Sequence, residues 1–144
     1  MSGDYAGDLT PEQAWELVSG EERATLVDVR TIEEWSYVGV PDTSSTGRPL
    51  VTVQWQRFSD GSRNPAFVDE LRAGLAEVDT GATERPLVML CRSGVRSAAA
   101  AHAATAAGLG PAYNVLDGFE GGLDANGHRG GTGWRADGLP WRQS

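Results

Sequence analysis

The sequence predicts an α/β fold built on a mainly parallel sheet. Segments rich in aliphatic and β-branched residues alternate along the chain with amphipathic segments of helical period. One strand segment, residues 87–90, is wholly apolar, as expected for a central parallel strand that is buried on both faces. The chain has 144 residues, the usual size of one domain, and we therefore expect a single domain over residues 1–144.

The first half of the chain carries two helix-start signals. Thr10 and Gln13 are spaced as a capping box at the start of a helix that can end at Gly20. The same spacing recurs at Thr31 and Glu34 and predicts a second, shorter helix. The other elements expected here are strands over residues 5–7, 25–29 and 50–55, that short helix over 31–37, and loops over 39–49 and 58–64.

The second half is expected to add two helices and two strands. Phe67, Leu71, Leu75 and Val78 share one face of a helix predicted over residues 65–78. The remaining elements are strands over residues 87–90 and 112–116, an alanine-rich helix over 97–107, a glycine-rich insertion over about 120–133, and a closing segment over 134–141 that we expect to pack back on the core.

Composition excludes several classes of function. All twelve basic residues are arginines, which excludes a Walker-type phosphate loop, a Schiff-base enzyme and a lysine general base. The net charge of −8 argues against nucleic acid or an anionic membrane as a partner. No apolar run approaches the roughly 18–20 residues that cross a bilayer, and residues 1–5 lack the features of a secretory signal. We therefore expect a cytoplasmic protein.

The chain has a single cysteine, Cys91. One cysteine excludes an internal disulfide, a CxxC redox pair and a cysteine-rich zinc site. The two histidines, His102 and His128, do not have the spacing of metal ligands. The sequence therefore implies no metal and no organic cofactor.

The segment Cys91–Ser97 (CRSGVRS) connects the apolar strand to the alanine-rich helix. In open α/β sheets, ligands bind at this edge, outside the carboxyl ends of the strands. Converging backbone N–H groups, the positive end of the helix, and the charges of Arg92 and Arg96 would all favour a thiolate over a thiol. A lone cysteine is commonly only a small buried hydrophobe, but a loop with two arginines, two serines and a glycine is typical of an anion site.

The segment CRSGVRS resembles the active-site loop of rhodanese-like sulfurtransferases. Two further groups of residues resemble the terminal signatures of that family. They are Asp28-Val29-Arg30 with Glu33-Glu34-Trp35 and Pro41 on the N-terminal side, and Gly133-Trp134 with Gly138-Leu139-Pro140 on the C-terminal side. The resemblance covers roughly residues 9–142. It implies a five-stranded, mainly parallel sheet with helices on both faces.

The resemblance also implies a reaction. Cys91, as a thiolate, would attack the outer sulfur of a small anionic donor such as thiosulfate, sulfite would leave, and the cysteine would carry a persulfide. Cyanide, a thiol or a protein acceptor would then remove that sulfur. The catalytic residue would be Cys91, and the substrate-binding residues would be Arg92, Ser93, Gly94, Val95, Arg96 and Ser97. Their backbone amides would hold the persulfide, and Arg92 and Arg96 would attract the donor.

The sequence departs from the family pattern in two places. Residues 38–41 read Val-Gly-Val-Pro where the family usually has Gly-His-Ile-Pro, so that histidine is absent. The C-terminal signature begins at Leu116-Asp117-Gly118-Phe119, and the glycine-rich insertion separates this start from Gly133-Trp134. With Asn126, His128 and Arg129, it could fold over the pocket or form a surface loop, and we favour the surface loop.

Other functions remain open at this stage. A persulfide carrier needs the same residues, whereas non-catalytic interaction modules on this fold often lack the cysteine. A cysteine-dependent phosphatase needs five residues between its cysteine and arginine, and only four separate Cys91 from Arg96. Trp55 and Arg57 follow the carboxyl end of a predicted strand. They are expected to line the pocket or its rim, and the alternative is a partly exposed loop.

Overall fold

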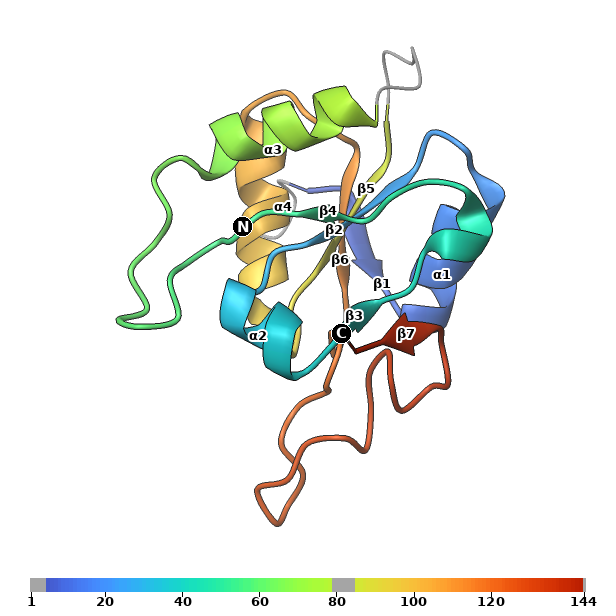
Figure 1. Cartoon of the computed structure of the whole chain (residues 1–144), viewed down its shortest axis with the longest axis vertical. Helices are drawn as coiled ribbons and strands as arrows, with labels where there is room; N and C mark the ends of the chain where they lie inside the picture. Colours follow the sequence, from blue (N-terminus) through green and yellow to red (C-terminus); the bar gives the residue numbers. More distant parts are fainter. Residues whose placement is uncertain (1–4, 79–84, 144) are drawn as a thin grey trace.

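The computed structural model describes residues 5–78 and 85–143, and it contains the expected five-stranded parallel sheet (Figure 1). Residues 1–4, part of the N-terminus expected to lack a secretory signal, lie outside these ranges. The strand order is β1-β6-β5-β2-β4, and each neighbouring pair is parallel. The strands are β1 (Gly7–Leu9), β2 (Thr25–Asp28), β4 (Val51–Thr52), β5 (Leu87–Leu90) and β6 (Ala112–Val115).

Helices cover both faces of the sheet, which confirms the predicted fold class (Figure 1). They are α1 (Pro11–Gly20), α2 (Ile32–Tyr37), α3 (Phe67–Glu77) and α4 (Val95–Ala106), with a 3₁₀ turn, η2 (Ser44–Thr46). Both predicted capping boxes form, at Thr10 with Gln13 and at Thr31 with Glu34. Each box satisfies backbone donors that the first turn of a helix leaves unpaired. None of the described helices is long and apolar enough to span a membrane.

The central strand β5 divides its side chains between two apolar clusters. Leu87 and Met89 pack on the face covered by α3 and α4, while Val88 and Leu90 pack on the face covered by α1. All four are completely buried. The alternation continues past the strand, so that Cys91 belongs to the α3–α4 side. Packing on both faces therefore fixes the register that places the cysteine at the edge of the sheet.

A second, two-stranded sheet lies in a region expected to be a loop. β3 (Val40–Pro41) pairs antiparallel with β7 (Trp141–Arg142), close to the C-terminal end of the chain. This pairing returns the closing segment to the body of the protein, and Trp134 within that segment is completely buried. The predicted bounds of the strands over residues 5–7 and 50–55 were wrong. β1 begins at Gly7 and ends at Leu9, and β4 contains only two residues of the longer predicted segment.

Candidate active site

Cys91 lies at the carboxyl end of the central strand, between β5 and the first turn of α4. Gly94 occupies the N-cap of α4 with φ at +104°, a left-handed conformation that favours glycine. This residue turns the chain directly from strand to helix. The loop therefore presents the cysteine to the positive end of a twelve-residue helix.

A turn at residues 117–121 holds the backbone of this loop from behind. The amide of Phe119 donates to the Cys91 carbonyl at 2.8 Å, and the amide of Glu120 donates to the Arg92 carbonyl at 3.0 Å. Gly118 lies so close that a Cβ on it would stand 2.4 Å from the Cys91 oxygen. The C-terminal signature that begins at this turn thus supports the active-site loop, and Gly118 is required for the close approach.

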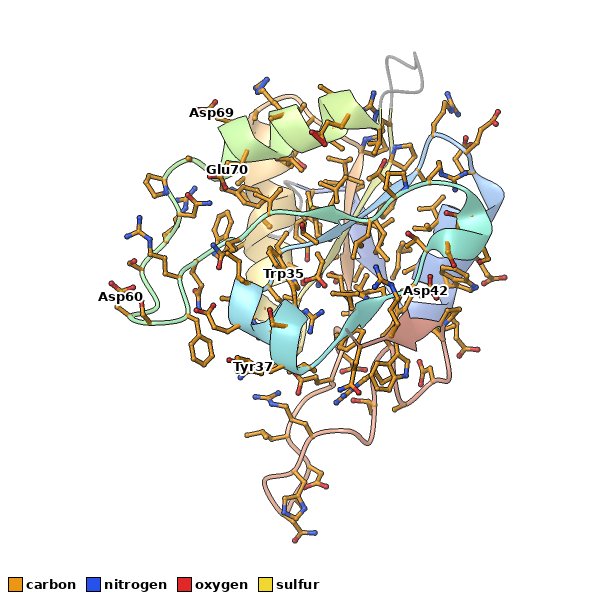
Figure 2. All side chains as sticks on the ribbon, in the orientation of Figure 1. Trp35, Tyr37, Asp42, Asp60, Asp69 and Glu70 are labelled. Carbon is orange, nitrogen blue, oxygen red and sulfur yellow. The ribbon has the colours of Figure 1, made fainter. Side chains whose placement is uncertain are left out.

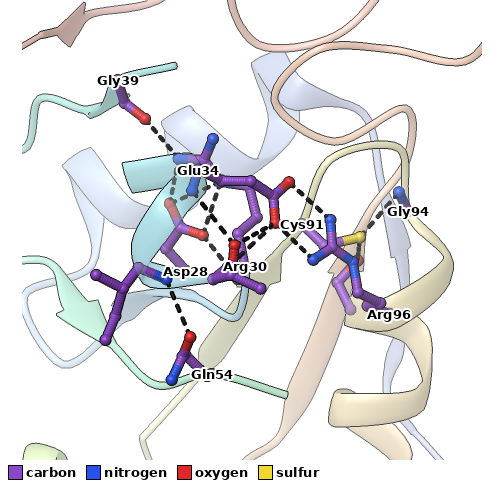
Figure 3. Close-up of polar contacts among 11 residues, drawn as sticks. Asp28, Arg30, Glu34, Gly39, Gln54, Cys91, Gly94 and Arg96 are labelled. Carbon is purple, nitrogen blue, oxygen red and sulfur yellow. Dashed lines mark hydrogen bonds and ion pairs between the residues drawn. The ribbon is translucent and has the colours of Figure 1, made fainter. Parts of the chain in front are cut away.

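Cys91 is 1% exposed, and among the described residues its sulfur has polar contacts with Gly94 and Ser97. The backbone amide of Gly94 donates to Sγ at 3.1 Å, as Figure 3 shows. The hydroxyl of Ser97 lies 3.1 Å from Sγ on the other side. A backbone donor and the helix N-terminus both favour negative charge on the sulfur. This is the environment that a thiolate nucleophile or a bound persulfide needs.

A chain of hydrogen bonds continues from the sulfur into the sheet. Ser97 Oγ donates to Asn114 Oδ1 at 2.5 Å, and Asn114 Nδ2 donates to the Asp8 carboxylate at 3.0 Å. Because a carboxylate only accepts, it fixes the direction of the Asn114 amide. The single hydroxyl proton of Ser97 is therefore directed at Asn114, while Ser97 Oγ also lies within hydrogen-bond distance of Sγ. Sequence reasoning missed Asn114, whose signal was a polar residue inside an otherwise apolar strand.

Arg96 forms a two-pronged ion pair with Glu34 (Figure 3). Its amino groups lie 2.7 Å and 2.9 Å from the two carboxylate oxygens. Burial raises the pKa of Glu34, but the hydrogen bonds and charge of Arg96, with the hydrogen bonds of Thr31, outweigh it and hold that pKa below its ordinary value. The predicted cation at position 96 is thus largely compensated by a residue of α2. From the sequence, Glu34 was expected in the helix cap and in the N-terminal signature, and its pairing with Arg96 was not predicted.

The Glu34→Gln variant is expected to lose stability in a pH-dependent way. The folded-state pKa of Glu34 is lowered, so its ionised form stabilises the fold above the ordinary value of 4.5, and this stabilisation is lost as pH falls through the folded pKa. We expect the variant to unfold about 1–3 kcal/mol more easily at neutral pH. The gap should close below about pH 4.5.

Urea unfolding of both proteins across this pH range measures the effect. Glu33→Gln is the matched control. Glu33 lies on the same helix, but Arg96 pairs with Glu34 and not with Glu33. A gap between wild type and Glu34→Gln that stays constant with pH would contradict the ion-pair account.

A cavity of about 420 Å³ borders the loop at Arg92 and Arg96, and Cys91 itself does not line it. Three arginines line it: Arg92 and Arg96 from the cysteine loop, and Arg129 from the glycine-rich insertion. Glu34 and Glu120 also line it. The expectation that the insertion is only a surface loop is therefore wrong at one position. Residues 122–128 are exposed on a loop that projects from the body of the protein (Figure 2). Arg129 is half-buried, because it lines the cavity and donates to the Gly121 carbonyl at 2.8 Å.

The residues expected at the rim, Trp55 and Arg57, do not line this cavity. Their neighbours Gln56 and Phe58 line it instead. Trp55 packs edge-on against Phe67, with ring centroids 5.0 Å apart, and borders a separate groove beside α4. Arg57 is exposed on the same loop. The strand does lead to the cavity, but β4 ends at Thr52, and the irregular backbone beyond it decides which side chains face the site.

Comparison with known proteins places these features in a family. The rhodanese-like domain profile matches residues 10–125. The protein RC0915 of Rickettsia conorii is 32% identical over 94% of this chain and 96% of its own length. The thiosulfate sulfurtransferase GlpE of Actinobacillus pleuropneumoniae is 29% identical over 92% of this chain and 90% of its own length.

Solved structures agree with the sequence comparisons. The crystal structure of Rv0390 from M. tuberculosis is 59% identical, with a TM-score of 0.86 over 97% of this chain and 99% of that one. The polysulfide-sulfur transferase homodimer of Wolinella succinogenes is 26% identical, with a TM-score of 0.58 over 99% of this chain and 82% of that one. The chain therefore shares its overall fold with both of these solved structures. The chain belongs to the rhodanese-like domain family.

Proposed function

We propose that this protein is a cytoplasmic thiosulfate sulfurtransferase that works through a persulfide on Cys91. The observation that carries the proposal is the position of the Cys91 sulfur. It lies at a helix N-terminus, accepts a hydrogen bond from the Gly94 amide, and belongs to a loop whose Arg92 and Arg96 line a cavity. The family and its sulfurtransferase relatives support this chemistry in general, and the choice of thiosulfate is our proposal.

In the first step, the Cys91 thiolate attacks the outer sulfur of thiosulfate. The new S–S bond forms with the thiolate electron pair, and the S–S bond of the donor breaks with its pair leaving on sulfite. The product is a persulfide anion on Cys91, and no electron is gained or lost overall. The Gly94 amide is placed to stabilise negative charge at the sulfur position. The amides of residues 92–97 are proposed to hold the persulfide.

In the second step, an acceptor takes the outer sulfur. Cyanide attacks it in the assay, and a small thiol or a protein thiol attacks it in the cell. The electron pair of the broken S–S bond returns to Cys91, which regenerates the thiolate. A cytoplasmic location is part of the proposal, because a reducing compartment preserves a free thiol between turnovers.

The proposal predicts two products from the reduced protein. With thiosulfate and cyanide it should form thiocyanate catalytically, since the cysteine is regenerated after each transfer. With thiosulfate alone it should gain the mass of one sulfur atom, which mass spectrometry detects. Treatment with a reducing thiol should remove that mass, and this marks it as a sulfane sulfur.

The outcomes separate the remaining functions. A persulfide without turnover would mean a sulfur carrier, or an acceptor other than those tested. If the protein forms no persulfide and shows no turnover, the proposal is overturned and an interaction module is favoured. Release of phosphate from a phosphotyrosine analogue would favour a phosphatase, for which the loop is one residue short.

A further inference from the structure

The charges around the active-site cavity are not fully compensated. Arg96 is paired with Glu34, at 2.7 Å. Glu120 has its own cation outside the lining, because Arg135 Nη2 lies 3.9 Å from its carboxylate. Arg92 and Arg129 remain, and within residues 5–78 and 85–143 no carboxylate lies within ion-pair distance of either guanidinium. Two uncompensated positive charges thus line one cavity of a protein whose net charge is −8.

Hydrogen bonds within the insertion, and from it to the turn at residues 117–121, hold Arg129 in place. The turn around Asp124 shapes the insertion, since its Oδ1 accepts from the amides of Asn126 and His128. The amide of Gly130 donates to the Glu120 carbonyl at 2.9 Å and returns the insertion to the active-site turn. Among the described residues, the Arg129 guanidinium donates one hydrogen bond, from Nη1 to the Gly121 carbonyl. Its other N–H groups are therefore available to a ligand.

We infer that Arg129 and Arg92 form an anion subsite that makes the enzyme select doubly charged sulfur donors over singly charged ones. This inference rests on the proposed function and assigns the glycine-rich insertion a role in donor specificity. The class of donor is a sulfur oxyanion such as thiosulfate, whose charged oxygens stay outside the cysteine loop while its outer sulfur reaches Cys91. Arg129 binds the charged oxygens of the donor, whereas Cys91 attacks its outer sulfur.

The Arg129→Gln variant separates charge from loop structure. Glutamine removes the cation but keeps a polar side chain, and the backbone bond from Gly130 to the Glu120 carbonyl still attaches the insertion. Thiosulfate carries two charges, and methanethiosulfonate presents the same kind of transferable sulfur with one. We expect KM for thiosulfate to rise about tenfold and KM for methanethiosulfonate about threefold, because attraction scales with the charge of the ligand. The kcat for both donors should change little.

Two further variants serve as controls. Arg129→Lys keeps the charge and should recover most of the preference for thiosulfate. His128→Ala alters the adjacent side chain, which is exposed and does not line the cavity, and it should leave both KM values unchanged. An equal loss for the two donors in Arg129→Gln would mean a loosened insertion and would overturn the inference.

Binding to an unreactive protein tests the subsite without turnover. In the Cys91→Ser background, calorimetry with thiosulfate should give a Kd that rises about tenfold when Arg129→Gln is added. An unchanged Kd, or no measurable binding, would overturn the subsite even if the enzyme is active. A clear effect of Arg129→Gln on binding, in a protein whose wild type shows no sulfur transfer, would uphold the subsite and reject the proposed function.

Discussion

Replacement of Cys91 by serine is expected to abolish persulfide formation and to lower kcat/KM for thiosulfate by at least about a thousandfold. The serine hydroxyl is a far weaker nucleophile than a thiolate at neutral pH and cannot carry a sulfane sulfur in the same way. The chain holds no second cysteine that could replace it. What remains in the variant is donor binding by the cavity, without a covalent step.

The fold should tolerate this substitution. A serine hydroxyl can occupy the position of Sγ, accept from the Gly94 amide and contact Ser97, so the polar contacts of the loop have partners. We expect a thermal unfolding midpoint within a few degrees of the wild type. Alkylation of wild-type protein with iodoacetamide gives a chemical counterpart, because it can modify only this one thiol and should remove activity to the same extent.

Kinetics show whether the covalent step is obligatory. If sulfite leaves before the acceptor binds, double-reciprocal plots at several cyanide concentrations should give parallel lines. Substantial turnover by Cys91→Ser, or intersecting lines for the wild type, would mean direct transfer from donor to acceptor. Either result would contradict a persulfide mechanism.

Local chemistry made much of the fold predictable from the sequence. Each capping box lies within four consecutive residues, so the starts of α1 and α2 could be predicted from spacing alone. The ends of β5 could be predicted because Pro86 precedes an apolar run and polar residues follow it. Since a strand end and a helix start enclose it, the position of the Cys91 loop followed from the same local signals.

Contacts between distant residues were not predictable in this way. Arg96 and Glu34 are 62 positions apart, and nothing in either segment indicates that the two side chains form an ion pair. The β3–β7 pair also joins residues about a hundred positions apart, and β3 consists of a valine and a proline in a segment whose composition is typical of a loop. In both cases the sequence identifies the residue types, and only the packed sheet decides which of them meet.

In the glycine-rich insertion, the sequence likewise did not predict the direction of one side chain, that of Arg129. Its composition predicts an exposed loop, and most of its residues are exposed. The direction of Arg129 depends on the Asp124 turn and on backbone bonds to residues 120 and 121. These contacts join the insertion to a turn that packs against the cysteine loop, and they leave no periodic pattern in the sequence.

Arg30 and Asp28 form a buried ion pair at the end of β2. Arg30 Nη2 lies 2.7 Å from Asp28 Oδ2, and both side chains are completely inaccessible to solvent. The same Nη2 donates to the Gly39 carbonyl at 2.7 Å, and the guanidinium lies over the ring of Phe119 at 4.3 Å. Arg30 thus joins the end of β2 to the segment after α2 and to the turn behind Cys91. These residues explain why the Asp-Val-Arg signature accompanies the cysteine loop.

The Arg30→Met variant is expected to lose about 3–5 kcal/mol of unfolding free energy, because it leaves the Asp28 carboxylate buried without its cation. Such a loss is a large share of the stability of an ordinary domain. Urea unfolding at neutral pH measures it, with the slope of the transition checked against the wild type.

The double variant Asp28→Asn with Arg30→Met distinguishes the unpaired charge from lost packing. It removes the charge but keeps a side-chain oxygen that can accept from the backbone amide of residue 30, which lies 3.1 Å from Asp28 Oδ1. In the wild type, Arg30 Nη1 has no hydrogen-bond partner among the described residues, so the pair itself is incompletely satisfied. The double variant should therefore regain at least about 1 kcal/mol over Arg30→Met. Equal stability of the two variants would place the loss in the Phe119 and Gly39 contacts, because removing the charge would then have made no difference.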